Sequence, residues 1–409
     1  MRLNVQVQLY PNQTMKTVLD SLCDYRRYCW NQGLELWNTL YEQRLISLPV
    51  ELRAKIKASL TDKTIKFSEE EQALRARFPA PTERKVRDEL VAQKADWQFE
   101  FSARVLQQAI KDLATAWNLF FNNPKTAGKP GFKSRKNPKQ GFKTDRARII
   151  NGRLVLDMHQ RHKDEWSSIR FKGASIPDGN LKLCAVTRTK GKYIATITTD
   201  VETVALPKTG KKTAVDANVD HFDTTGGQTS LKPELLDRLY GRVRTYQRQL
   251  ARKRKVNKNY RNSKGYQATR AKLQATYERI RNVQNDLLHK FTTGLYREFD
   301  TVVIEDLDVK GMQMKKKAKN LHRSLFGRFR QFMEYKAEKF GKTLIIADRF
   351  YPSTQRCSNC GHVKTGDEKI TLSGNQKHGT KHHEYVCYKC GHEDDRDHNA
   401  VLNLLALAE

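Results

Sequence analysis

The sequence has 409 residues and carries 76 Lys and Arg against 45 Asp and Glu, which gives a formal net charge of +31 at pH 7 and indicates a polyanionic partner. Its 38% of hydrophobic residues, with 17 Phe and 15 Tyr, exclude a purely disordered basic chain and suffice for about two to four packed units. No apolar run approaches the ~20 residues that span a bilayer, and the first residues alternate polar and apolar, so we expect a soluble intracellular protein without a signal peptide.

The first third of the chain predicts one strand followed by helices. Apolar and polar residues alternate from Leu3 to Tyr10, which is typical of a strand. Apolar residues then recur at helical spacing from about Thr14 to Tyr41, with Asn12 or Thr14 as the cap, and again from about Ser102 to Phe121. The charged segment between these helices, residues 44–100, predicts one or two further helices whose role the sequence does not indicate.

A basic segment from Lys125 to Arg148 has nine Lys or Arg against the single acid Asp145, with glycines and two phenylalanines between them. A basic loop with spaced aromatic residues suits a phosphate backbone, and the alternative is a solvated linker whose Phe side chains dock on the core. The residues of this loop that we expect to bind nucleic acid are Lys129, Lys133, Arg135, Lys136, Lys139 and Lys143. Short alternating runs from Arg153 to Thr199 then predict a small β-barrel or sheet, which the N-terminal strand would join.

The second half of the chain starts a new domain near residue 208, where a basic linker runs into Thr213–Val215 and then Asp216. Residues 232–290 hold 17 Lys or Arg against four acids, with apolar residues at helical spacing, and predict a long basic helical pair. This pair either has a merely solvated charged face or binds nucleic acid. The candidates for such binding are Arg252, Lys253 and Arg254.

Two β-branched runs in this half each end at an acidic residue. The run Thr301–Ile304 leads into Glu305, as Val215 leads into Asp216. A helix over about residues 321–340 and a strand over 343–347 follow. The succession of strand, helix and strand is typical of an α/β layer.

Four of the seven cysteines form two Cys-x-x-Cys-Gly motifs, namely Cys357, Cys360, Cys387 and Cys390. Four soft sulfur ligands close a tetrahedral shell and predict a structural zinc site, whereas a redox dithiol needs only one such motif. The intervening loop contributes alternative ligands, His378, His382 and His383. The remaining three cysteines, Cys23, Cys29 and Cys184, are expected to be packed thiols.

A third acidic cluster precedes the C-terminal helix and contains Asp394, Asp395 and Asp397. Any one of these carboxylates could simply cap that helix. The set formed by Asp216, Glu305 and Asp397 is more informative, because three carboxylates that converge repel one another unless divalent cations neutralise them. Carboxylate and water ligands suit Mg²⁺ or Mn²⁺.

These residues together resemble the split RuvC nuclease of TnpB proteins, a family related to the type V CRISPR effectors. The resemblance rests on the order Asp, Glu, Asp, on the basic helical insert after the first strand, and on the four-cysteine ribbon just before Asp-x-Asn-Ala at Asp397. It extends to the opening Leu9–Asn12, the stretch Gly128–Gln140 and the Gln-Arg-Cys-Ser-Asn-Cys motif, and so covers nearly the whole chain. The sequence departs from the family in its long ribbon loop and in Asn218, where the family usually has Gly; Asn tolerates a left-handed turn.

The resemblance implies a multidomain α/β protein with an RNase H-like (RuvC) nuclease, an inserted zinc ribbon, an N-terminal wedge-like β-barrel and a helical recognition lobe. The expected boundaries are 1–12 and 150–207 for the barrel, 13–149 for the lobe with its basic loop, 208–356 and 392–409 for the nuclease, and 357–391 for the ribbon.

The implied activity is RNA-guided cleavage of double-stranded DNA beside a short flanking motif, in the cytoplasm of a prokaryotic cell and close to its nucleoid. Two Mg²⁺ or Mn²⁺ ions at Asp216, Glu305 and Asp397 would act in hydrolysis, and the protein would be a monomer or a homodimer. The alternatives are a TnpB-derived CRISPR effector, a regulator that binds DNA without cutting it, and a cut-and-paste transposase. The last is disfavoured because such enzymes generally order their acids Asp, Asp, Glu.

Overall fold

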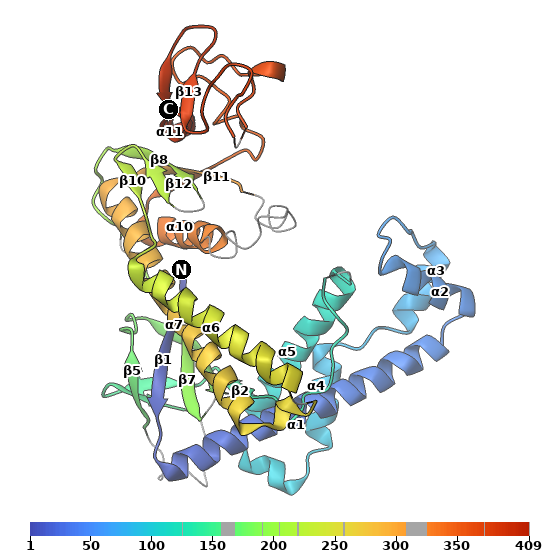
Figure 1. Ribbon diagram of the computed structural model, residues 1–409. Helices are drawn as coiled ribbons and strands as arrows, with labels where there is room; N and C mark the ends of the chain where they lie inside the picture. The colour runs from blue at the N-terminus through green and yellow to red at the C-terminus, as the bar shows by residue number, and fades with distance from the viewer. Residues whose placement is uncertain are drawn as a thin grey trace. The chain divides into compact units, whose positions relative to one another are not determined.

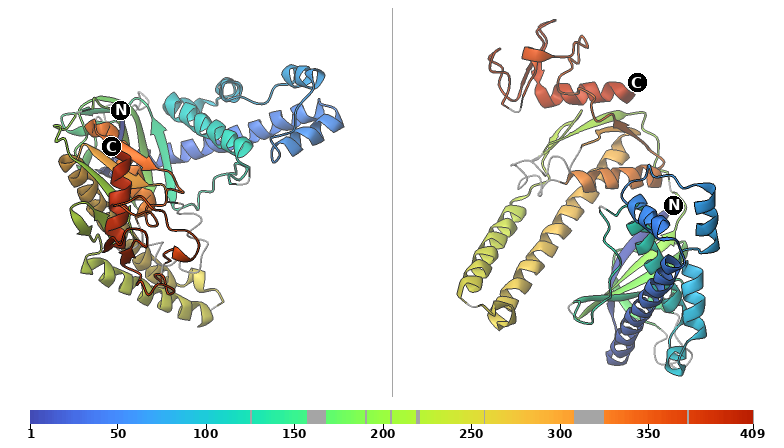
Figure 2. Two further views of the ribbon diagram at one scale, coloured as in Figure 1. Left: turned by 90° about the horizontal axis from the view of Figure 1, so that it is seen from above. Right: turned by 90° about the vertical axis from the view of Figure 1, so that its right-hand side faces the viewer.

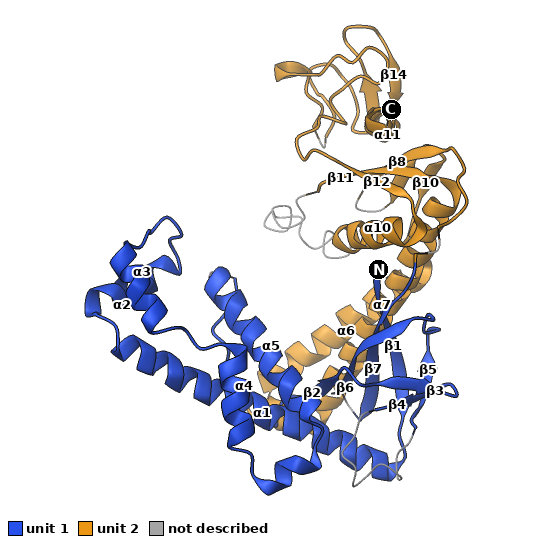
Figure 3. Cartoon of the chain, turned by 180° about the vertical axis from the view of Figure 1, so that it is seen from behind, with its two compact units in different colours: residues 1–202 blue, residues 203–409 orange. Residues whose placement is uncertain are grey.

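The computed structural model describes residues 1–124, 126–156, 168–189, 191–203, 205–218, 221–256, 258–307, 325–371 and 373–408. The chain forms two compact units, Met1–Glu202 (unit 1) and Thr203–Glu409 (unit 2), which Figure 3 shows in different colours. In the described part of the chain, no helix is both long enough and apolar enough to cross a membrane.

Two long helices form the helical part of unit 1, α1 (Gln13–Ile46) and α5 (Ala103–Asn122). Their apolar faces pack against each other in one core, so both predicted helices are confirmed. The predicted cap is also confirmed, because the Asn12 side chain accepts a hydrogen bond of 2.8 Å from the Met15 backbone N–H.

The charged segment between α1 and α5 contains more helices than the sequence analysis expected. It forms α2 (Val50–Ser59), α3 (Glu69–Arg77) and α4 (Glu83–Ala92), followed by the short 3₁₀ helix η1 (Asp96–Glu100). Helix α3 buries none of its residues, and a capping box at its N-terminus defines its start. Apolar periodicity could not reveal such a helix.

The sheet of unit 1 has the strand order β2-β6-β7-β1-β5, and a hairpin of β3 and β4 lies beside it. The strands are β1 (Arg2–Tyr10), β2 (Lys139–Thr144), β3 (Arg148–Ile150), β4 (Arg153–Val155), β5 (Arg170–Gly173), β6 (Asn180–Thr189) and β7 (Lys192–Asp200). The first strand joins this sheet as predicted, by pairing with β7 and β5. Among the described strands, the edge strands β2 and β5 do not pair with each other, so a closed barrel remains a prediction.

One part of the expected basic loop is a strand instead. Residues 139–144 form β2, which pairs with β6 and buries Phe142 in the core of unit 1. The sheet therefore begins before the expected domain boundary at residue 149, because β2 already belongs to it. The alternation in Lys139–Thr144 was obscured by its basic side chains, which point away from the core.

Unit 2 is built on a mixed sheet with the order β10-β9-β8-β11-β12. Its strands are β8 (Lys212–Ala217), β9 (Phe222–Thr224), β10 (Gly227–Thr229), β11 (Thr301–Glu305) and β12 (Thr343–Ala347). The three strands β8, β11 and β12 run parallel, while β9 and β10 form an antiparallel extension at one edge. The predicted strands before Asp216 and Glu305 are thus neighbours in one sheet.

Helices cover both faces of this sheet (Figure 1). On one face α7 (Lys264–Glu298) and α10 (Phe326–Phe340) pack on Val215, Val302 and Ile304. On the other face α11 (Arg396–Leu405), followed by the 3₁₀ turn η5 (Ala406–Ala408), packs on Ala214 and Val303. The first four residues of the predicted helix 321–340 lie outside the described residues.

The predicted basic helical pair is confirmed. Helix α6 (Glu234–Val256) and α7 lie side by side over most of their length (Figure 2). The 3₁₀ turn η3 (Tyr260–Asn262) belongs to their connection. The ribbon contains the two short strands β13 (Glu384–Val386) and β14 (Glu393–Asp395), the turn η4 (Gly366–Glu368), and a small core of Cys357, Ile370, Tyr385 and Cys387.

Candidate functional site

Asp216 and Glu305 lie on the same face of the unit 2 sheet. Strand side chains alternate between faces, and Val215 and Ile304 point into the core beneath α7 and α10. Asp216 and Glu305 therefore point to the opposite face, the one that α11 covers. Glu305 is the last residue of β11, which pairs with β8 in parallel, so the two carboxylates come from adjacent strands.

Asp397 completes the predicted set from the first turn of α11, which contacts β8, β9 and β11. It does not cap this helix. The cap is Asp395, whose Oδ1 accepts hydrogen bonds from the backbone N–H groups of Asp397 at 2.9 Å and His398 at 3.2 Å. The Asp397 side chain is thus left to face the sheet, where Arg396 donates to its Oδ1 at 3.2 Å.

Burial and mutual repulsion shift the pKa values of the sheet carboxylates. Asp216 is only 6% exposed, and burial raises its pKa well above the ordinary value. Repulsion from Glu305, Asp397 and Asp223 raises this pKa further. Burial also raises the pKa of Glu305, although a hydrogen bond of 2.6 Å from the Ser353 hydroxyl opposes this shift. Carboxylates in such a cluster fit a divalent cation, because only opposite charge makes their joint ionisation favourable.

Two neighbours of the cluster were not identified by the sequence analysis, His221 and Asp223. Asp223 lies directly opposite Asp216 in the antiparallel pairing of β8 and β9. His221 Nε2 is 3.0 Å from Asp223 Oδ2 and 3.6 Å from Asp397 Oδ2. A prediction of the hairpin after Asp216 would have found Asp223, since residues paired across strands share a face. Asp220, the other nearby acid, lies outside the described residues.

Asn218 has a role other than the one expected. Its backbone does not adopt a left-handed conformation; in the described part of the chain, Asn151 is the non-glycine residue that does. The Asn218 amide instead donates to Asp223 Oδ2 at 3.0 Å and to Asp216 Oδ2 at 3.4 Å. The departure from Gly thus places a hydrogen-bond donor between two carboxylates.

The four cysteine sulfurs are arranged as a tetrahedral metal requires. Cys357 Sγ is 3.7 Å from Cys390 Sγ, and Cys360 Sγ is 3.6 Å from Cys387 Sγ. Four sulfurs at ~2.3 Å from one Zn²⁺ would lie about 3.8 Å apart. The backbone N–H of His392 lowers the pKa of the Cys390 thiol to about 6, which favours the thiolate that binds metal.

The three histidines of the ribbon loop do not join this cluster. His378 stacks on Tyr388 with ring centroids 4.2 Å apart, and His382 and His383 contact each other edge to face. Among the described residues, the group that could hold this metal consists of the four cysteines.

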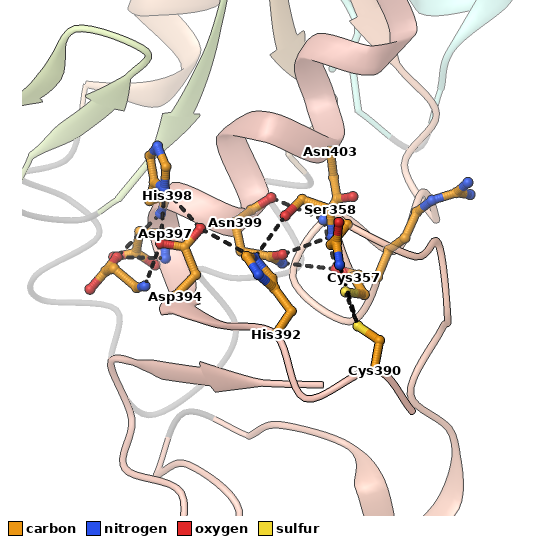
Figure 4. Close-up of polar contacts among 12 residues, drawn as sticks. Cys357, Ser358, Cys390, His392, Asp394, Asp397, His398, Asn399 and Asn403 are labelled. Carbon is orange, nitrogen blue, oxygen red and sulfur yellow. Dashed lines mark hydrogen bonds and ion pairs between the residues drawn. The ribbon is translucent and has the colours of Figure 1, made fainter. Parts of the chain in front are cut away.

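Asparagines of α11 connect the ribbon to the carboxylate cluster (Figure 4). Asn399 is fully buried, accepts from the Ser358 N–H at 3.0 Å and donates to the Arg356 carbonyl at 2.8 Å. Asn403 donates to the carbonyls of Ser353 at 2.9 Å and Arg356 at 2.7 Å. Ser353 thereby links this network to Glu305 through its hydroxyl, a role that the sequence analysis missed.

The nine candidate nucleic-acid contacts fall into two groups. Three of the cations bind other groups of the protein. Lys133 Nζ lies 3.4 Å from the Trp30 ring centroid, Lys143 pairs with Asp112 at 2.6 Å, and Lys253 donates to Gly265 and Thr269. Burial also lowers the pKa of Lys133 to about 8. The other six candidates are exposed, namely Lys129, Arg135, Lys136, Lys139, Arg252 and Arg254. Two of these also have partners, since Arg254 donates to the Tyr266 hydroxyl at 3.1 Å and Lys129 Nζ lies 5.6 Å from the Trp117 ring centroid.

The fold and the site define a mixed α/β protein with a carboxylate cluster beside a four-cysteine ribbon. Three family models match the chain: "Cas12f1-like, TNB domain" over residues 326–404, "Probable transposase" over 196–316, and "Helix-turn-helix domain" over 1–45. A "Putative RNA-guided DNA endonuclease" of Streptomyces pristinaespiralis is 31% identical over 315 residues, which cover 75% of this chain and 72% of the relative. InsQ of Escherichia coli K12, with the same description, is 28% identical over 340 residues and 77% of each chain.

The chain therefore belongs to the TnpB-like family of these RNA-guided DNA endonucleases. Its fold is similar to that of a protein in the Cas12f1–sgRNA–target DNA complex, with a TM-score of 0.50 and 13% identity over 99% of this chain and 98% of the other.

Proposed function

We propose that this chain is an RNA-guided DNA endonuclease that hydrolyses target DNA at the carboxylate cluster of unit 2. This proposal is supported by the positions of Asp216 and Glu305 on adjacent parallel strands, on the face that α11 covers with Asp397 in its first turn, and by the burial and repulsion that raise the pKa of Asp216. The family relatives, which are described as RNA-guided DNA endonucleases, support the same activity.

The proposal assigns roles to the parts of the chain. Residues 208–356 and 392–409 would form the RNase H-like (RuvC) nuclease, with the ribbon 357–391 inserted. The order β10-β9-β8-β11-β12, with three parallel strands and an antiparallel edge, supports this assignment. In unit 1, the sheet would form the wedge and the helices would form the recognition lobe.

The carboxylates of the cluster would bind divalent cations, and their neighbours would keep the carboxylates oriented. When bound, Mg²⁺ or Mn²⁺ at Asp216, Glu305 and Asp397 would activate a water and stabilise the leaving 3′ oxygen, which gives products with 5′ phosphates. Ser353 orients Glu305 with its hydroxyl, and Arg396 fixes one oxygen of Asp397. These contacts restrict the carboxylate rotamers before any ion binds.

The charge of +31 suits the nucleic-acid partners of this activity, a guide RNA and a double-stranded DNA target. Base pairing with the guide would supply sequence specificity, so the protein needs mainly to hold phosphate backbones. Of the six exposed candidate cations, Arg254 would have to exchange its hydrogen bonds to Tyr266 for a phosphate, and the remaining five are open to a backbone in the described structure. The oligomeric state and the association with the nucleoid stay predictions.

The test is to purify the full chain from its native locus, sequence the RNA that copurifies, and supply a plasmid library with a matching target beside randomised flanks. We expect cleavage of matched plasmids that contain one short flanking motif, and no cleavage after the RNA is removed. An RNA from a transposon end supports a TnpB nuclease, whereas a CRISPR repeat identifies an effector. Guide-dependent binding without any cutting would overturn the proposal in favour of a regulator.

A further inference from the structure

The hairpin after Asp216 brings additional donor atoms to the carboxylate cluster. We propose that His221, Asp223 and Asp397 form a divalent-cation site with mixed imidazole and carboxylate ligands, next to Asp216. This inference rests on the proposed nuclease function and deepens it, because it adds two ligands of this chain to the three carboxylates of the motif. It also specifies which cations the nuclease prefers.

The position of Asp223 is the first support. Strand pairing sets Asp223 directly opposite Asp216, and the two acids share the face covered by α11. Like charges directly opposite each other destabilise a sheet, and both side chains are buried. A cation between Asp223 and the neighbouring carboxylates removes this repulsion, whereas a purely structural position would be filled more favourably by an apolar residue.

The position of His221 is the second and independent support. Its Nε2 atom is buried and has no hydrogen-bond partner among the described residues, although Asp223 Oδ2 and Asp397 Oδ2 lie 3.0 Å and 3.6 Å away. The one donor atom from each of these three residues lies within 4.8 Å of the others. A ring nitrogen that lies within ion-pair distance of two carboxylate oxygens, but outside hydrogen-bonding geometry, is placed to share a cation with them.

The surrounding hydrogen bonds leave lone pairs for an ion, because Asp223 Oδ2 accepts one hydrogen bond from Asn218 and a carboxylate oxygen has a second lone pair. Arg396 binds Oδ1 of Asp397, so Oδ2 is the oxygen that faces His221. The Asn218 amide binds Asp223 and Asp216 together, which fixes their relative orientation. Residues that orient ligands in this way are usual around protein metal sites.

The donor set also indicates the kind of cation. Mg²⁺ prefers oxygen ligands only, whereas an imidazole nitrogen suits first-row transition ions better. We therefore infer that the His221 position binds Mn²⁺ more tightly than Mg²⁺. The three motif carboxylates offer only oxygen ligands, so they do not favour Mn²⁺ over Mg²⁺ to the same extent.

The experiment measures metal binding directly and does not depend on cleavage. The full chain, freed of RNA and retaining its zinc, is titrated with Mn²⁺ while electron paramagnetic resonance reports the free ion. We expect His221→Ala and Asp223→Asn each to lower the number of tightly bound Mn²⁺ ions by one or to weaken that ion at least tenfold. Asp286→Asn, which removes an exposed acid of α7, is the matched control and should bind as the parent does.

A second measurement uses the unaltered chain, in case a variant does not fold. When hydrogen peroxide and ascorbate are added as oxidant and reductant, Fe²⁺ bound at the proposed position should generate hydroxyl radicals that cleave the backbone at the 221–223 hairpin as well as at the start of α11. Excess Mn²⁺ should suppress this cleavage better than Mg²⁺. Equal Mn²⁺ number and affinity in both variants, or the absence of cleavage at the hairpin, would overturn the inference. Failure of the proposed nuclease function would give another result than failure of this cation site, because the ions would bind as described while no guided DNA cleavage occurs.

Discussion

The two metal centres proposed for unit 2 are assembled in opposite ways. The cysteine cluster takes its donors from two short turns of one ribbon, and its sulfurs already lie at the spacing of a tetrahedral ion. The carboxylate cluster takes its donors from one strand, the end of another strand and the start of a helix, in a range from residue 216 to residue 397. The first centre is local in the sequence, and the second exists only in the folded unit.

The two centres also affect stability differently. Thiolates that bind a structural zinc couple the free energy of binding to the folding of the ribbon. The carboxylates are buried close to one another, and this raises the pKa of Asp216 and disfavours the metal-free fold at neutral pH. We infer that one centre maintains the structure and that the other maintains chemistry at some expense in stability. Four predictions test this difference between the two centres.

The largest effect is expected for Cys357→Ser. Apparent binding free energies of structural zinc are ~10–16 kcal/mol in small zinc domains, so loss of one ligand should release the ion and unfold the ribbon. Zinc content by atomic absorption and thermal unfolding by circular dichroism are the measurements. His382→Ala is the control and should retain full zinc, because His382 lies outside the cluster. A Cys357→Ser variant with full zinc content and unchanged melting would contradict a structural ribbon.

Asp216→Ala should have the next largest effect, a loss of cleavage with nucleic-acid binding retained. Removal of a group that stabilises a transition state typically lowers rates by about 10³-fold, and here the loss should be at least of this order. Binding of guide RNA and target DNA, measured by filter retention, should change little. The matched control is Asp237→Ala, an exposed acid on α6, which should cut normally. Retained cutting by Asp216→Ala would exclude the assigned site.

A smaller effect is expected for Ser353→Ala. A hydrogen bond to a charged group contributes about 1.5–3 kcal/mol, and its loss from Glu305 should lower cleavage roughly 10- to 100-fold. The loss should be partly recovered at high Mg²⁺, because ion binding can reorient Glu305. Ser353→Thr keeps the hydroxyl and should restore cleavage at ordinary Mg²⁺. Equal rates for the Ala and Thr variants would remove Ser353 from the site.

The smallest effect is an increase in stability for Asp216→Asn without divalent cations. Since the folded-state pKa is raised, ionisation of Asp216 destabilises the fold once the pH exceeds the unfolded value of ~4, and Asn removes this penalty. We expect the melting temperature at pH 7 to rise by about 2–4 °C, the shift that ~1 kcal/mol gives in a unit of this size. The gain should vanish as the pH falls below ~4. A lower melting temperature at pH 7 would contradict the repulsion inferred at this cluster.

Much of the fold could be predicted because its signals are local. The long amphipathic helices α1, α5, α6 and α7 and the strands before Asp216 and Glu305 follow from apolar periodicity. Two elements lack such a signal and could not be located from the sequence. Helix α3 buries no residue, and β2 alternates buried residues with basic ones that suggested a loop.

The sequence by itself determined the cysteine motif through ligand type and spacing, and it predicted the three motif acids through their order in the chain and the resemblance to TnpB proteins. Only the tertiary structure decided which acid caps α11, and only strand pairing put Asp223 opposite Asp216 and His221 beside Asp397. The reason is physical. A turn brings two ligands three positions apart in the sequence together by itself, whereas carboxylates from separate elements come together only where sheet register and helix packing place them.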